Sequence, residues 1–312
     1  SFVILFYMIL KGREFLHIRK EKFIHYFQCV DCGGQLSFDS KLICKSCQRE
    51  YEVVEGVPVF LPSDVKDDQK SQLDAQSKYF DKEYTELPEY KLENWRKSMI
   101  KRLDLASENQ IEKENKVFCD FGVGGTAYTV IEQAKKYGHC LGTDISLQGM
   151  IKASKYAEQQ GVGDKCFFFV ATVEKLPLKS KAIDFTASIS VLEHLFDDQK
   201  AISELCRVSN DVIYIVVPNT YKRVWLFLWP MYYYNDKKVG HLRHYAEEDL
   251  EKKFKSHDFD KKQVIYNGHL VKISQILLNK YLSNEKWWKM EEKDFVNKSK
   301  IAAQLNLIFG RK

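Results

Sequence analysis

The stretch VFCDFGVGGTAYTV, residues 117–130, decides the fold. It begins with a short apolar run typical of a buried strand, passes through three glycines, and ends in residues that suit a helix. A glycine turn between a strand and a helix lets the backbone approach a ligand closely and directs the amino end of the helix toward it. Alone the motif is weak, because the same turn can join a strand to a helix without a ligand.

Short apolar segments alternate with amphipathic ones from residue 116 onward, which predicts parallel βαβ units and a doubly wound α/β sheet. Seven strands are expected, in VFCDFG (117–122), HCLGTDI (139–145), KCFFFVA (165–171), AIDFTASI (182–189), DVIYIVVP (211–218), KKQVIYNG (261–268) and QLNLIFG (304–310). Open α/β sheets bind ligands beyond the carboxyl ends of their strands, so we look for the functional site there.

The second predicted strand ends in LGTDIS, which places Asp144 next to the glycine turn. A carboxylate at this position can accept hydrogen bonds from both hydroxyls of a ribose. NAD is a rival ligand on these two features alone, because a glycine turn followed about twenty residues later by an acid is also its fingerprint.

Residues 116–255 resemble class I S-adenosylmethionine-dependent methyltransferases, in particular the type 11 group that includes the quinone-biosynthesis enzymes. The likeness continues through ATVEKLPLKSKAIDFTASISVLEHL, residues 171–195, and this part of the pattern disfavours NAD. The resemblance implies a seven-stranded Rossmann-like methyltransferase sheet, S-adenosyl-L-methionine as cofactor and a methyl-transfer activity (EC 2.1.1).

The resemblance also implies which residues bind the cofactor. Asp120, Gly122 and Gly124 would line its methionine part, Asp144 would hold the ribose, and Ile145 would pack on the adenine. Thr126 stands where the family's third motif glycine falls, and Thr172 stands where an acidic residue usually meets the adenine amino group. Thr172 still offers a hydroxyl, and backbone groups near Val173 can read the adenine edge. The complete set expected at the cofactor is Asp120, Gly122, Gly124, Gly125, Asp144, Ile145, Thr172, Val173 and Ser188.

Methyl transfer is an in-line displacement at a sulfonium, so the enzyme must align a nucleophile and, for a hydroxyl or amine acceptor, remove a proton. Glu193 and His194 follow the fourth predicted strand, and His194 is the best-placed candidate base, with a helix-stabilising role as the alternative. His241 is a further candidate. Some quinone-type relatives use a second acid three places before the glutamate to hold a divalent metal. Ser190 stands there in this chain, so no catalytic metal is expected.

Residues 220–245 form an aromatic-rich insertion after the fifth strand, where class I methyltransferases often vary their acceptor pockets. Its aromatic side chains suit a hydrophobic or ring-containing acceptor or a membrane interface, and a packed lid or dimer contact is the alternative. The phrase from His241 to Tyr245 resembles the GHxRxY phrase of small-molecule methyltransferases. Arg243 would suit an anionic group or hold the following helix. The candidate substrate residues are Trp229, Tyr233, Arg243, His244 and Tyr245.

Four cysteines near the amino end form two C-x2-C pairs, Cys29 with Cys32 and Cys44 with Cys47. Two such knuckles can close on one tetrahedral zinc ion, and Gly33 and Gly34 supply the backbone angles of the first knuckle. Two disulfides, four ordinary cysteines or an iron site are the alternatives. Residues 29–62 resemble the Trm112-type zinc ribbon, which in its family is structural or helps to present a partner or substrate.

These features predict four parts: an N-terminal extension (1–22), the zinc ribbon (23–62), a helical connector or cap (63–115) and the methyltransferase domain (116–312). The connector carries Phe80, Tyr84, Trp95, Met99 and Ile100 at the spacing of one helix face. The apolar run at residues 2–10 is too short to span a bilayer, so we expect it to be buried or peripheral.

The 48 basic residues are interspersed with 43 acidic ones, so the net charge of +5 is weak evidence for nucleic acid. The cysteine pattern favours a reducing compartment, and we expect a cytoplasmic protein. The leading hypothesis is methyl transfer to a small or lipid-linked acceptor, with peripheral membrane contact as an option. An RNA methyltransferase that uses the ribbon for substrate or partner binding is the first alternative. A non-catalytic scaffold is the second. The oligomeric state is not predicted.

Overall fold

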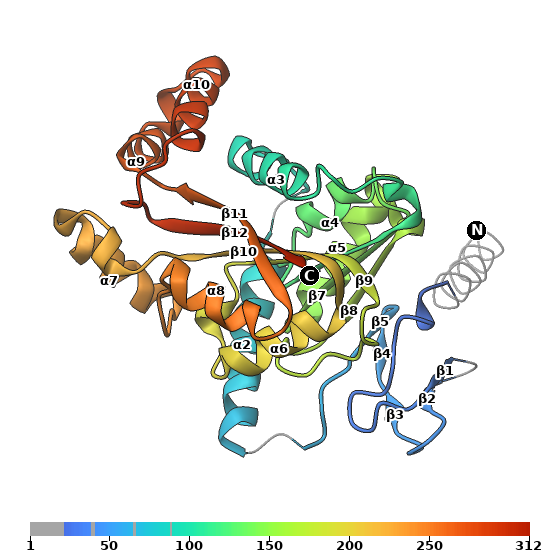
Figure 1. Ribbon diagram of the computed structural model, residues 1–312. Helices are drawn as coiled ribbons and strands as arrows, with labels where there is room; N and C mark the ends of the chain where they lie inside the picture. The colour runs from blue at the N-terminus through green and yellow to red at the C-terminus, as the bar shows by residue number, and fades with distance from the viewer. Residues whose placement is uncertain (1–21, 39–40, 65–66, 88) are drawn as a thin grey trace.

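A seven-stranded sheet forms the centre of the protein in a computed structural model that describes residues 22–38, 41–64, 67–87 and 89–312 (Figure 1). Each of the seven predicted segments forms one of its strands. They are β6 (Val117–Phe121), β7 (His139–Asp144), β8 (Cys166–Val170), β9 (Ile183–Ile189), β10 (Ser209–Pro218), β11 (Phe259–Asn267) and β12 (Gln304–Arg311). The predicted apolar segment at residues 2–10 lies outside the described residues.

The order of the strands is β11-β12-β10-β9-β6-β7-β8. All neighbouring pairs from β10 to β8 are parallel, whereas β12 runs antiparallel to both β10 and β11. The carboxyl ends of β6, β7, β8, β9, β10 and β11 therefore lie at one edge of the sheet. The chain builds outward from β6 to β8 and then returns to β9 on the other side of β6. This reversal between β6 and β9 is the topological switch point at which open α/β sheets bind ligands.

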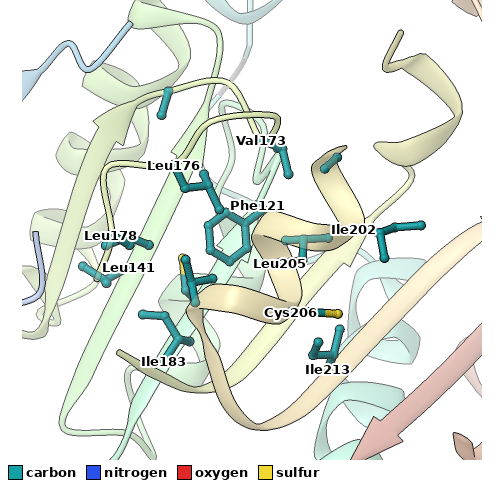
Figure 2. Packing of buried hydrophobic residues seen from close by; sticks show 14 of the residues in the cluster. Phe121, Leu141, Val173, Leu176, Leu178, Ile183, Ile202, Leu205, Cys206 and Ile213 are labelled. Carbon is teal, nitrogen blue, oxygen red and sulfur yellow. The ribbon is translucent and has the colours of Figure 1, made fainter. Parts of the chain in front are cut away.

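Alternating side chains of the strands enter two separate cores, one on each face of the sheet. Val117, Cys119 and Phe121 of β6 belong to the first core, whereas Phe118 belongs to the second. Helices α6 (Asp198–Val208) and α8 (Glu247–Lys255) cover the first face, and α3 (Asn94–Ala106), α4 (Tyr128–Gln133) and α5 (Leu147–Gln159) cover the second. Figure 2 shows the ring of Phe121 in the first core, with Leu205 of α6 nearby.

The N-terminal segment forms a small three-stranded antiparallel sheet of β1 (Leu36–Phe38), β2 (Leu42–Cys44) and β3 (Glu50–Tyr51), followed by a hairpin of β4 (Val53–Val54) and β5 (Val57–Pro58). This unit covers β8, the edge strand of the large sheet. Phe60 donates its backbone N–H to the Val170 carbonyl at 2.8 Å, and the Phe27 ring contacts Phe60 and Phe169 with centroid distances of 5.3 and 5.0 Å. The edge strand is thereby protected from pairing with other chains.

Helix α2 (Asp67–Thr85) connects this unit to the second face of the sheet and packs against α5. The carboxylate of Asp81 accepts a hydrogen bond from the backbone N–H of Gln148 at 3.0 Å, at the amino end of α5. One turn further along α2, near its C-terminal end, the ammonium group of Lys152 donates to the Tyr84 carbonyl at 3.1 Å. Both contacts hold α2 across the carboxyl edge of the sheet.

Three further helices lie beyond the sheet: α7 (Trp229–Val239), α9 (Leu270–Leu277) and α10 (Asn284–Phe295). Helix α7 follows β10 and α9 follows β11, so both extend from the carboxyl edge (Figure 1). Within the described ranges, no helix has the length and hydropathy that crossing a membrane requires.

Candidate active site

The glycine turn after β6 is folded tightly against β7. Gly122 has φ +80°, and its N–H donates to the Thr143 carbonyl at 2.8 Å. A Cβ on Gly122 would lie 2.2 Å from a methyl group of Val191, so only glycine fits this position without movement. Because Gly122 has no side chain, its backbone is accessible at the carboxyl edge of the sheet.

Asp144 ends β7 beside this turn. Its carboxylate accepts hydrogen bonds from the Gly124 N–H at 3.0 Å and from the Ser146 N–H at 3.1 Å. Burial raises the pKa of Asp144, while these two N–H donors favour its ionised form. The side chain is 8% exposed, and the exposed part borders a cavity.

That cavity lies at the carboxyl edge of the sheet and contains about 690 Å³ of empty space, part of it open to solvent. Ligand pockets typically measure roughly 300–1,000 Å³, so its size suits a nucleoside-sized ligand. Its walls come from α2, the glycine turn, the end of β7 and the loops after β8 and β9. The lining residues are Leu73, Gln76, Phe80, Tyr84, Gly122, Asp144, Ile145, Ala171, Thr172, Val173, Ser190, Val191, His194 and Leu195.

The structure brings most of the predicted cofactor residues to this cavity. Five of them line it, namely Gly122, Asp144, Ile145, Thr172 and Val173. Gly124 meets the site through its hydrogen bond to Asp144. Gly125 lies under α2, where a Cβ would be 2.8 Å from Tyr84.

Asp120 and Ser188 are buried and do not line the cavity. Asp120 accepts a hydrogen bond from Thr129, and burial raises the pKa of Asp120 to about 7. Its second carboxylate oxygen and the Ser188 hydroxyl have no hydrogen-bond partner in the part of the chain that the structure describes. Ser190, two residues after Ser188, faces the cavity in its place.

The wall formed by α2 is the part of the cavity that sequence reasoning did not assign. Phe80 and Tyr84 were placed on one helix face, but their spacing does not reveal what that face covers. In the structure this face closes the cavity opposite the sheet, with Gln76 one turn and Leu73 two turns before Phe80. Gln76 donates from its amide to the His194 carbonyl at 3.3 Å and so joins this wall to the loop after β9.

His194 lines the cavity, whereas Glu193 lies behind it. The Nδ1 atom of His194 is 3.3 Å from the Gly240 carbonyl oxygen, which can only accept a hydrogen bond. Nδ1 is therefore the protonated nitrogen, and Nε2 carries a lone pair. Burial and the nearby His241 lower the pKa of His194, which keeps the ring neutral. Glu193 is 1% exposed, and burial raises its pKa to about 8.

His241 comes from the distant insertion and packs directly behind His194, with ring centroids 4.9 Å apart. Its Nδ1 lies 2.8 Å from Asp236 Oδ1, and its Nε2 lies 3.9 Å from Glu193 Oε1. The three predicted catalytic residues, 48 positions apart at most in the sequence, therefore form one cluster, with ligand atoms within 4.8 Å of one another. Asp236 was not singled out in the sequence.

The candidate substrate residues do not line the cavity. Arg243 donates to the Phe196 carbonyl at 2.9 Å, and the Tyr245 hydroxyl donates to the Leu192 carbonyl at 3.0 Å. His244 bridges the Asn219 carbonyl and Asp236, at 2.7 Å each. These three residues fasten the insertion to the loop after β9 and to the end of β10. Trp229 and Tyr233 lie on α7 with 39% and 57% exposure.

The four predicted metal ligands also come together. The sulfur atoms of Cys29, Cys32, Cys44 and Cys47 lie within 4.8 Å of one another. The Cys29–Cys47 and Cys32–Cys44 Sγ distances are 3.7 and 3.5 Å, which are too long for disulfide bonds of about 2.05 Å. They are close to the ~3.8 Å separation of sulfurs at the corners of a tetrahedron with Zn–S bonds of about 2.3 Å. The donor set and its spacing therefore fit zinc.

Residues 119–212 match the model of a methyltransferase domain family. Norajmaline N-methyltransferase of Rauvolfia serpentina is 37% identical over 89 residues, which are 28% of this chain and 30% of that enzyme. The chain thus aligns with about a third of the length of this curated relative.

Two solved structures share the fold at 15% identity. One is magnesium protoporphyrin IX methyltransferase of Synechocystis PCC 6803 with bound SAH, with TM-score 0.52 over 78% of this chain and 99% of that one. The other is a chain in the complex of the Haloferax volcanii Trm112 methyltransferase activator with a methyltransferase, with TM-score 0.50 over 74% of this chain and 96% of that one.

The sheet order, the switch-point cavity and these matches define the class of the fold. The chain has the Rossmann-like fold of class I methyltransferases, with a small cysteine-containing unit on the edge strand β8. The region from residue 119 to residue 212, which includes the glycine turn, Asp144 and His194, is the part that matches the methyltransferase domain family.

Proposed function

We propose that this protein is an S-adenosylmethionine-dependent methyltransferase that acts on a small or lipid-linked acceptor. One observation carries the proposal: the Gly122 turn and the Asp144 carboxylate border one open cavity at the switch point of the sheet. Asp144 would hold the ribose hydroxyls, Ile145 and Val173 would pack on the adenine, and the bare backbone at Gly122 would admit the methionine part. The hydroxyl of Thr172 would face the adenine edge.

The cofactor supplies an electrophilic methyl group on a sulfonium. A lone pair of the acceptor forms the new bond to the methyl carbon while the carbon–sulfur bond breaks, and both electrons of that bond remain on sulfur. The acceptor then loses one proton if its nucleophile is a hydroxyl or an amine. We assign this proton to Nε2 of His194, because Nδ1 is held by the Gly240 carbonyl and the ring is neutral. Glu193 and His241 would support His194 from behind.

The acceptor class rests on the relatives. Norajmaline N-methyltransferase and magnesium protoporphyrin IX methyltransferase are both named for small-molecule substrates. The exposed aromatic insertion beside the cavity suits the same class or a lipid-linked acceptor. Nothing in the described residues specifically favours RNA or a scaffold role over this proposal.

We also propose that Cys29, Cys32, Cys44 and Cys47 bind one structural zinc ion. The fit of the sulfur distances to a tetrahedral site supports this. Gly34 makes the arrangement possible, because a Cβ at this residue would lie 2.9 Å from the Cys44 sulfur. The remaining cysteines are buried as free thiols, which agrees with a cytoplasmic location as our proposal for the compartment.

The test of the activity begins with binding. Isothermal titration with S-adenosylhomocysteine should give saturable heat with the wild-type protein and little or none with Asp144→Ala. Asp260→Ala is the matched control, because Asp260 lies at the amino end of β11, on the opposite edge of the sheet. Absence of binding by the wild-type protein, or unchanged binding by Asp144→Ala, would remove the proposal.

The test of the metal site is elemental analysis. We expect one zinc ion per chain, lost in Cys32→Ser and retained in Cys206→Ser, which changes a buried thiol of α6. Full zinc occupancy in Cys32→Ser would show that the ligands are assigned wrongly.

A further inference from the structure

Seven large apolar side chains of residues 225–234 are exposed on one short segment. They are Trp225, Leu226, Phe227, Trp229, Met231, Tyr233 and Tyr234, and we call them the aromatic face. Leu226, Phe227 and Tyr234 are 70%, 66% and 73% exposed. Single exposed apolar residues are ordinary, but such a concentration marks a surface that binds another apolar surface.

The aromatic face lies beside the candidate active site. The segment begins at the carboxyl end of β10, and the Leu242 N–H after α7 donates to the Glu193 carbonyl at 2.8 Å. The Arg223 carbonyl accepts from the Ala302 N–H at 2.9 Å, which fixes the start of the segment near β12. A second exposed apolar segment, with Leu277, Leu278 and Tyr281, begins at the last residue of α9, the helix that extends from the same edge of the sheet (Figure 1).

The exposed charged side chains of residues 220–245 are all basic. Residues 220–245 contain five basic residues and one acidic residue, Asp236, which is buried against two histidines. Lys222, Lys237 and Lys238 are exposed, and none of them forms an ion pair with a described carboxylate. Lys237 lies over the Tyr233 ring, 5.0 Å from its centroid. The surface thus combines aromatic rings with uncompensated cations.

We propose that the aromatic face is a docking surface for an anionic lipid bilayer, which brings membrane-held acceptors to the active site. Trp and Tyr rings concentrate at the boundary between lipid tails and headgroups, and nearby lysines are attracted to anionic lipids. The contact is peripheral, since no described helix can cross a bilayer. The proposal names the source of the acceptor and so rests on the proposed methyltransferase function.

A bilayer fits this surface better than a second copy of the chain does. A twofold contact through the aromatic face would bring the lysines of both copies into one interface, where no described acidic residue of the insertion is exposed to compensate them. An anionic membrane neutralises all of them at once.

Vesicle flotation tests the proposal on the full chain. We expect the protein to float with vesicles of phosphatidylcholine and phosphatidylglycerol and to bind vesicles of phosphatidylcholine alone more weakly. Leu226→Glu and Phe227→Glu should each remove most of the binding. The matched control is Ile111→Glu, because Ile111 is 76% exposed but precedes β6 at the opposite edge of the sheet.

The charge is tested with Lys222→Gln and Lys238→Gln, which should each weaken binding to anionic vesicles about fivefold. Lys181→Gln, at the amino end of β9, should leave it unchanged. Asp144→Ala, which tests the cofactor site, should float like the wild type, so failure of the methyltransferase proposal stays separate from failure of this one.

Three results would overturn the proposal: no flotation of the wild-type protein with anionic vesicles, equal flotation of Phe227→Glu and wild type, or a dimer in solution that Phe227→Glu dissociates. The last result would assign the aromatic face to self-association. Retained binding of S-adenosylhomocysteine by Leu226→Glu and Phe227→Glu shows that these variants are folded.

Discussion

Removal of zinc should weaken cofactor binding, although the four cysteines do not touch the cavity. Three backbone hydrogen bonds from the N-terminal unit bracket the cavity wall at residues 171–173. Phe60 N–H donates to the Val170 carbonyl at 2.8 Å, Gln28 N–H donates to the Pro177 carbonyl at 2.8 Å, and Lys179 N–H donates to the Tyr26 carbonyl at 2.9 Å. Small zinc ribbons lose their fold without metal, so we expect these bonds to depend on the proposed zinc ion.

The magnitude follows from those three bonds. Each contributes roughly 0.5–1.5 kcal/mol net, so the wall would lose about 1.5–4.5 kcal/mol of support. In the zinc-free protein, cofactor binding must order residues 171–173 again. The lost support therefore makes the free energy of cofactor binding less favourable by the same amount. Since about 1.4 kcal/mol corresponds to a factor of ten, the Kd should rise by about tenfold to about a thousandfold.

The assay is titration calorimetry with S-adenosylhomocysteine, on zinc-loaded and chelator-treated protein, with circular dichroism to show that the large domain stays folded. A milder perturbation is Lys175→Met, which breaks the 2.7 Å ion pair between the wall and Asp64. Such an exposed pair is worth at most about 1 kcal/mol, so the Kd should rise by no more than about fivefold. The control is Lys155→Met, because the Lys155–Glu55 pair joins the same unit to α5 away from the wall.

The reasoning is refuted if zinc-free protein with an intact circular dichroism spectrum binds S-adenosylhomocysteine with an unchanged Kd. An equal rise of the Kd in Lys175→Met and Lys155→Met would show that any weakened contact of the N-terminal unit lowers affinity, and that the cavity wall has no special part in it.

Three further predictions concern single residues. Gly161→Ala, which places a Cβ at positive φ in open space, should cost about 1–2 kcal/mol in urea unfolding and leave cofactor binding unchanged. Gly122→Ala should cost more, because its Cβ would also lie 2.2 Å from Val191, and it should abolish cofactor binding. Burial raises the pKa of Glu193 to about 8, above its unfolded value, so the folded state binds this proton more tightly and loses stability as the pH rises toward about 8. Glu193→Gln should remove that loss, so the free energy of unfolding of the variant relative to wild type should rise from pH 4.5 to about pH 8 and level off above it; a constant difference over that range would contradict the pKa shift. Phe27→Ala should cost about 3–5 kcal/mol, measured by denaturant unfolding, whereas Phe227→Ala, on an exposed side chain, should change stability by less than about 0.5 kcal/mol.

The strands and the cofactor turn were predictable because their signals are local. Each strand is a short apolar run, and the positive φ of Gly122 belongs to a motif contained in a few residues. The neighbouring positions of this turn and Asp144 follow from the parallel pairing of β6 with β7.

Other parts of the site depend on contacts between distant residues. Helix α2 was expected to have a buried face, but only the fold shows that Phe80 and Tyr84 cover the cavity. The sequence left two roles open for Arg243, contact with an anionic acceptor or support of the following helix, and only the fold shows that Arg243 bonds to a backbone carbonyl 47 positions earlier. The role of Asp236 in orienting His241 is equally non-local.

The docking of the N-terminal unit on β8 has a consequence for synthesis of the chain. Phe60 leaves the ribosome more than one hundred residues before Phe169, its partner on β8. At roughly 5–20 residues per second, that interval lasts several seconds. During this time the aromatic side chains of the nascent N-terminal unit are exposed to water. Early binding of a metal ion would let this unit fold before β8 has been synthesised.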